Sequence, residues 1–138
     1  MQRVIKVNGQ DILLKPSANF MFYYRHARLN GEDVPDFQTD LKRLADMEKL
    51  QGEFSKIDST NALDVLQRTN IFEFSAIIRR MLWTFAYAAN KSMLPFEEWC
   101  DALYEYDAVE ASKTVMDLVN DNFFLMLGVQ KPREAASI

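Results

Sequence analysis

Residues 71–90 read IFEFSAIIRRMLWTFAYAAN and form the most hydrophobic stretch of this 138-residue chain. Apolar residues occupy nearly every side of the helix that this stretch would form, interrupted by Glu73 and by Arg79 and Arg80. A membrane-spanning helix is disfavoured, because each arginine near its centre would cost about 2.5–3.5 kcal/mol on insertion scales. The stretch therefore predicts a central core helix, or a helix whose second face is covered by another subunit.

The clearest β signal lies near the start of the chain. Residues 3–7 and 10–14 flank Asn8-Gly9, the dipeptide that best accepts the two positive φ angles of a type I′ hairpin turn. Side chains alternate along each strand, so one face of the hairpin carries Ile5, Val7, Ile12 and Leu14. An isolated hairpin is marginally stable in water, and we therefore expect this apolar face to pack on helices.

Capping residues and apolar spacing predict the remaining helices. The predicted segments are Ser17 to Asn30, Phe37 to about Phe54, residues 62–68, a helix with Pro95 at its first position, and a last helix from Asp107 to Gly128. Glycine and proline number four each, and so few chain breakers favour long helices. The fold class is therefore α+β, mostly α, with an N-terminal two-stranded hairpin packed on a bundle of five or six helices.

The chain length fits one domain. We expect a single helical domain over residues 1–128, with the hairpin at 1–15, and a polar tail at 129–138 that frays. The net charge of −4 argues against a large basic surface for nucleic acid. The first residues lack the apolar segment of a secretion signal, so we expect a cytoplasmic protein that contacts neither nucleic acid nor membrane.

Sequence motifs of catalysis are missing, and we expect no enzyme, no cofactor and no metal. Neither a phosphate-binding glycine loop nor a nucleophile elbow occurs in the chain. The single cysteine, Cys100, has the acidic neighbours Glu98 and Asp101, which would raise rather than lower its pKa. We expect Cys100 to be a core residue beside Trp99, and the single histidine, His26, to be a solvated or hydrogen-bonded helix residue.

Charge is concentrated between residues 97 and 121, which hold eight acidic residues and one basic residue. Glu98, Asp101 and Glu105 are expected nearly on one helical face. Such a cluster could bind a metal, but no histidine motif accompanies it, and a solvated face is the favoured interpretation. Two alternative functions remain open: an acidic helical DNA mimic or inhibitor that binds a basic protein, and a small enzyme built on these carboxylates.

Two consecutive apolar runs, residues 20–24 and 123–127, are too dense for one helical face. Either the hairpin and other helices cover both sides of them, or they form a binding surface for another chain. The second interpretation predicts self-association, at least to a dimer. It also makes Phe123, Phe124 and Met126 the candidate partner-binding residues, because they follow the acidic segment and lie close to the tail.

The order of these features resembles a known family. The hairpin VIKVNGQDILLK is followed by LNGEDVPDFQTDL at residues 29–41, and then by the core helix, LPFEEW at residues 94–99 and the last helix. Over residues 3–125 the chain resembles the tail assembly chaperones of long-tailed, siphovirus-type phages and prophages, especially those of Gram-positive hosts.

The resemblance implies a non-enzymatic chaperone that acts in the cytoplasm of the bacterial host. Such a protein binds the tape-measure protein, keeps it soluble before the tail tube polymerises, and is absent from the mature virion. A longer product made by ribosomal frameshifting recruits the tail tube protein, and family members self-associate into homo-oligomers. No residue-level binding site carries over from the family, so the candidate contacts rest on this sequence alone.

Overall fold

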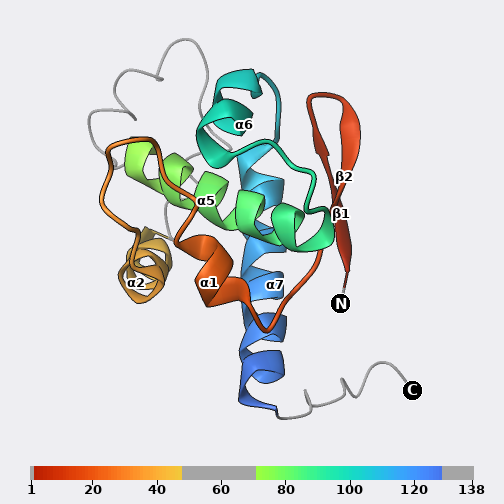
Figure 1. Ribbon diagram of the computed structural model, residues 1–138. Helices are drawn as coiled ribbons and strands as arrows, with labels where there is room; N and C mark the ends of the chain where they lie inside the picture. Colours follow the sequence, from red (N-terminus) through yellow and green to blue (C-terminus); the bar gives the residue numbers. More distant parts are fainter. Residues whose placement is uncertain (1, 48–70, 129–138) are drawn as a thin grey trace.

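The computed structural model describes residues 2–47 and 71–128 (Figure 1). In these residues it contains the strands β1 (Arg3–Val7) and β2 (Gln10–Leu14), followed by five helices. The helices are α1 (Phe20–Tyr24), α2 (Phe37–Met47), α5 (Ile71–Ala89), α6 (Phe96–Ala102) and α7 (Ala108–Leu127). The predicted α+β, mostly α fold is confirmed. The helix expected at 62–68, the end of the helix expected to reach Phe54, and the tail at 129–138 lie outside the described residues.

Helix α5 runs through the centre of the molecule, and α7 crosses behind it (Figure 1). Helix α5 contacts β2, α1, α2, α6 and α7. The side chains that these contacts bury completely include Ile77, Ile78, Met81, Leu82 and Phe85. The prediction that residues 71–90 form the core helix is therefore confirmed.

The hairpin has the predicted register, with Val7 opposite Gln10 and Ile5 opposite Ile12. Asn8 and Gly9 have φ angles of 55° and 75°, as a type I′ turn requires. The face that carries Ile5 packs into the core, and the amide of Lys15 donates a hydrogen bond of 3.3 Å to the carbonyl of Phe85 on α5. The hairpin is thus fixed to the core helix at its open end.

Asn8 at the hairpin tip also holds the segment between α6 and α7. Its Oδ1 accepts hydrogen bonds from the amides of Tyr104 at 2.9 Å and Glu105 at 3.0 Å. Its Nδ2 donates to the carbonyl of Ala102 at 3.1 Å. A residue needed for the turn therefore also fixes a loop far away in the sequence.

The helix expected from Ser17 to Asn30 is much shorter, because α1 ends at Tyr24. The Ser17 hydroxyl accepts a hydrogen bond from the amide of Asn19 and closes a turn before the helix instead of capping it. After Tyr24 the amide of Ala27 bonds to the carbonyl three residues back, and Ala27 is completely buried. The helix propensity of aromatic residues is modest, so tertiary contacts decide where α1 ends.

The other helix ends follow the sequence signals closely. The Asp107 carboxylate accepts hydrogen bonds from the amides of Val109 and Glu110 at the start of α7. Gly128 ends the same helix in the left-handed conformation that favours glycine. Pro95 lies one position earlier than expected, immediately before the first residue of α6.

A buried polar network joins α1, α2 and α5. The Tyr24 hydroxyl donates a hydrogen bond of 2.5 Å to Oδ2 of Asp40, and Nε of Arg80 donates to the same oxygen at 2.9 Å. The side chains of Asp40 and Arg80 are only 7% and 15% exposed. Burial lowers the pKa of Arg80, but Asp40 and Tyr24 outweigh this effect and raise it, so the arginine stays charged. The network fixes the position of α2 on the core helix.

We predict that Leu82→Asp unfolds the protein, whereas Phe72→Asp on the same helix leaves it folded. Leu82 is completely buried and Phe72 is 76% exposed, so only the first variant places a charge in the core. Burial of an unpaired carboxylate costs several kcal/mol, a large part of a typical stability of about 5–15 kcal/mol. Circular dichroism and thermal unfolding measure both variants. A Leu82→Asp protein that melts at the wild-type temperature would contradict the core assignment.

We also predict that stability falls above pH 10 more steeply in the wild type than in Tyr24→Phe. Burial and the hydrogen bond to Asp40 raise the pKa of Tyr24 above the ordinary tyrosine value. The unfolded chain therefore loses this proton near pH 10 while the folded chain keeps it, so the contribution of Tyr24 is complete below pH 10 and is lost as the pH rises. Urea unfolding of both proteins between pH 8 and 11 measures the difference. Equal pH dependence would show that Tyr24 is not held protonated by the fold.

Candidate functional site

An apolar groove lies between α1, α2 and the C-terminal half of α7. It encloses about 290 Å³. Its apolar walls include Phe20 and Met21 from α1, Phe37 and Leu41 from α2, and Phe123 and Met126 from α7. The groove therefore brings together the two apolar runs that the sequence singled out, residues 20–24 and 123–127.

The floor of the groove is an aromatic cluster that continues into the core. The ring of Phe20 lies 4.9 Å from that of Phe37 and 4.6 Å from that of Phe85 on the core helix. The amide of Ser17 donates a hydrogen bond of 2.6 Å to Oδ1 of the buried Asn122, which connects the chain before α1 to α7. The floor is thus fixed by packing on one side and by a hydrogen bond on the other.

The rim of the groove is exposed. Phe123 and Leu127 are 57% and 58% exposed, and Met126 is 45% exposed. In α1, Phe20 and Tyr24 are buried, whereas Phe22 is exposed. The described elements therefore do not cover both sides of the two runs, and this exposure favours the interpretation of a binding surface.

Two of the three candidate contacts line the groove, and the third lies beside it. Phe123 and Met126 belong to the wall formed by α7. Phe124 is half-buried and contacts the ring of Phe123 edge to face, at a centroid distance of 5.9 Å. The contribution of Phe37 and Leu41 to the groove could not be predicted, because nothing local indicates that α2 lies against the end of α7.

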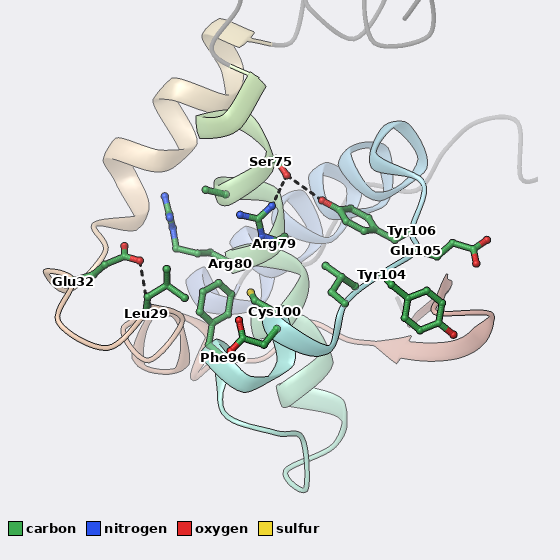
Figure 2. A pocket seen from close by; sticks show the side chains of 13 residues that line it. Leu29, Glu32, Ser75, Arg79, Arg80, Phe96, Cys100, Tyr104, Glu105 and Tyr106 are labelled. Atoms are coloured by element: carbon green, nitrogen blue, oxygen red, sulfur yellow. Dashed lines mark hydrogen bonds between the residues drawn. The ribbon is translucent and has the colours of Figure 1, made fainter. Parts of the chain in front are cut away.

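A second opening, a polar cavity of about 660 Å³, lies against the other side of α5 (Figure 2). Cys100 is half-buried there, and burial raises the pKa of its thiol. Asp101 raises this pKa further, as the sequence predicts, but nearby Arg79 lowers it. The effect of Arg79 could not be predicted, since α5 and α6 are brought together only by the tertiary fold.

The acidic residues are less regularly arranged than the sequence suggests. Helix α6 ends at Ala102, so the expectation that Glu105 shares a helical face with Glu98 and Asp101 is wrong. Asp121 is buried, 3.9 Å from the guanidinium of Arg3. In residues 2–47 and 71–128, no group of three or more histidine, cysteine or acidic residues is placed to hold a metal ion.

His26 also differs from expectation, because it lies in the turn after α1 and not within a helix. Its side chain is exposed, and its ring contacts that of Phe22 at a centroid distance of 5.5 Å. The position agrees with a solvated histidine.

Comparison with known proteins gives no match for this chain among protein-family models, curated proteins or solved structures. Across the described segments, no helix combines the length and the hydropathy that a membrane span requires. Any functional assignment therefore depends on the residues of this chain, including those that line the apolar groove and the polar cavity.

We predict that the protein self-associates at least to a dimer through the rim of the groove. Exposed Phe123 and Leu127 are rarely left uncovered side by side on a monomer, so Phe123→Ser should shift the equilibrium towards the monomer. Phe72→Ser, which changes a still more exposed ring away from the groove, should leave association unchanged. Sedimentation velocity at high micromolar concentration measures all three proteins. A wild-type monomer at that concentration would remove the prediction.

Proposed function

We propose that this protein is a phage tail assembly chaperone that binds the tape-measure protein and keeps it soluble before the tail tube polymerises. The observation that carries the proposal is the apolar groove between α1, α2 and α7, with its exposed rim. The resemblance in the order of elements supports the same function. The protein acts in the cytoplasm of the bacterial host and is not part of the mature virion.

The groove has the chemistry that recognition of a hydrophobic helix requires. An amphipathic helix inserts apolar anchors spaced three or four residues apart into such a groove. Phe20 and Phe37 form a rigid aromatic floor, while Met21 and Met126 supply flexible walls that adapt to different anchors. The protein can therefore cover many similar segments of one long helical partner.

The acidic surface supports this function without providing most of the affinity. Exposed acids on α6 and α7, such as Glu97, Glu98 and Asp117, keep the protein soluble while its groove is apolar. They also attract basic side chains on a partner and so increase the rate of encounter. Binding needs no nucleotide, cofactor, nucleic acid or membrane in this proposal.

Self-association and partner binding use the same surface in this proposal. A homo-oligomer would cover the exposed rim at Phe123 and Leu127 until the tape-measure protein displaces the second copy. The tail tube protein would be recruited by a longer product, made by ribosomal frameshifting, that carries this domain. The chaperone would then bring the tube subunits to the partner that they have to surround.

An acidic DNA mimic and a carboxylate-based enzyme are less favoured. A mimic needs a regular array of exposed negative charge, whereas Asp121 is buried and Asp107 is used as a helix cap. A metal-dependent enzyme needs converging ligands, and Glu105 lies outside the helix that carries Glu98 and Asp101.

Co-expression with the tape-measure protein tests the proposal. Wild type should raise the soluble fraction of the tape-measure protein several-fold, and Phe123→Ser should lose most of this gain because it removes an apolar wall. Phe124→Ser tests the neighbouring candidate, and Phe72→Ser is the matched control with an exposed ring elsewhere.

Equal solubility of the tape-measure protein with and without wild type would overturn the proposed function. A wild-type effect that survives both Phe123→Ser and Phe124→Ser would keep the function but reject the groove. Salt dependence separates the alternatives, since apolar binding persists in high salt whereas binding by an acidic mimic weakens steeply.

A further inference from the structure

The polar cavity lies between α5, α6 and the loops around residues 29–32 and 103–106 (Figure 2). Its volume of about 660 Å³ is in the range of small-molecule sites. Polar groups from α5 and from the 103–106 loop meet at one end of it, and the apolar side chains of Leu29, Phe96 and Leu103 line other parts of its wall.

Arg79 is the central polar group of this cavity. Its Nη1 donates a hydrogen bond of 2.5 Å to Oγ of Ser75, and this oxygen lies 3.3 Å from the hydroxyl oxygen of Tyr106. Figure 2 shows the guanidinium reaching towards both hydroxyls. Among the residues described, no carboxylate lies within ion-pair distance of Arg79.

The next residue, Arg80, differs from Arg79 in having a carboxylate partner. Arg80 is paired with the buried Asp40, and its charge is thereby compensated within the fold. Arg79 is also half-buried, but the Ser75 hydroxyl and the Cys100 thiol are weak substitutes for a counter-charge. A guanidinium has five N–H donors in a planar fork, so Arg79 retains donors that match the two oxygens of a carboxylate.

The acidic residues around the cavity limit the charge of a ligand. Glu32, Asp101 and Glu105 line it together with the two arginines, so the lining carries one more negative than positive charge. Glu32 accepts a hydrogen bond from the amide of Leu29, and the carboxylate of Glu105 points away from Arg79 in Figure 2. These carboxylates repel a multiply charged anion such as phosphate, while a single carboxylate can still reach the guanidinium.

We propose that this cavity binds a carboxylate carried on an apolar stem, with the Arg79 guanidinium and the hydroxyls of Ser75 and Tyr106 holding the carboxylate and Phe96 and Leu103 contacting the stem. A free organic acid and an acidic side chain of a protein both supply such a carboxylate, and the experiment below distinguishes the two sources. The site is separate from the apolar groove and does not depend on the function proposed for it.

The fold keeps the walls of this site in place before any ligand arrives. Tyr106 forms an isolated β-bridge with Val7, and Asn8 binds the backbone of Tyr104 and Glu105. The 103–106 loop is therefore held by the hairpin tip, and Ser75 and Arg79 lie on the rigid core helix. Preorganisation of this kind reduces the entropic cost of binding.

Two pairs of probes test the proposal by NMR titration. The first pair is 3-phenylpropionate and its neutral amide, and the second is the blocked peptide acetyl-Leu-Glu-Leu-amide and its glutamine analogue. We expect a carboxylate probe to bind in the millimolar range and its amide partner about tenfold more weakly. Cys100 is the one cysteine of the chain and lines the cavity, so the bound probe should also slow its alkylation by iodoacetamide.

The variants distinguish a site at Arg79 from general charge effects. Arg79→Gln should weaken carboxylate binding about tenfold and remove the protection of Cys100. Arg79→Lys should give an intermediate affinity, because it keeps the charge without the planar fork. Lys113→Gln removes one exposed positive charge on α7 and should bind as wild type does. Circular dichroism shows whether each variant is folded. If Arg79→Gln is unfolded, the comparison uses Arg79→Lys in its place.

Binding of the free acid alone would identify a free organic acid as the ligand, and binding of the glutamate peptide would identify an acidic protein side chain. Each of these results supports the proposal. It is overturned if neither carboxylate binds, if the amides bind equally well, if inorganic phosphate binds more tightly, or if the folded Arg79 variants keep wild-type affinity.

Discussion

Helix α5 carries apolar side chains around almost its whole circumference, and the fold has to supply a cover for every side of it. The hairpin covers one side near Phe85, α1 and α2 cover another, and α6 and α7 cover the rest. Each of these elements is too short or too amphipathic to be stable alone, so its position is set by what it covers on α5. The arrangement of the domain follows from this one requirement.

Arg79 and Arg80 are the two positions near the middle of α5 where charged side chains replace apolar ones. Successive residues of an α-helix point about 100° apart, so the two guanidiniums face different neighbours. Arg80 meets Asp40 and Tyr24 and fixes α2 against the core helix. A buried pair of this kind is weak evidence for net stability, because the cost of desolvating both charges offsets their attraction. Both arginines line the polar cavity, but Arg79 donates a hydrogen bond to the Ser75 hydroxyl whereas Arg80 donates one to a carboxylate. The two arginines therefore differ in their surroundings and not in their chemistry.

The features that the sequence predicted well depend on neighbouring residues. The Asn8-Gly9 turn, the Asp107 cap and the Gly128 end are each determined by the backbone needs of a few positions. The core helix was predictable because a helix with apolar residues on all sides is stable only when it is buried. The exposure of Phe123 and Met126 was predictable for a similar reason, since a dense apolar run exceeds one helical face.

The features that could not be predicted join segments far apart in the chain. The length of α1 depends on the burial of Ala27 and on the anchoring of Tyr24 by Asp40 and Arg80, none of which is encoded locally. The second role of Asn8, as the support of the 103–106 loop, could not be predicted, because its role in the turn already explains an asparagine at this position. The two walls of the groove that α1 and α2 supply could not be predicted, because the sequence does not show where the end of α7 lies relative to them.

The length of α7 gives the strongest reason to regard the groove as functional. A helix of 20 residues is about 30 Å long, and its C-terminal part extends past the other elements (Figure 1). Val115 and Leu118 already complete the cover of α5, and both are fully buried. The turns beyond them bury the polar residues Asp121 and Asn122 on one side and carry exposed Phe123 and Leu127 on the other. Exposed apolar residues favour aggregation, so a surface kept only for stability would be polar here. Apolar side chains at this position therefore support the proposed contact with another chain.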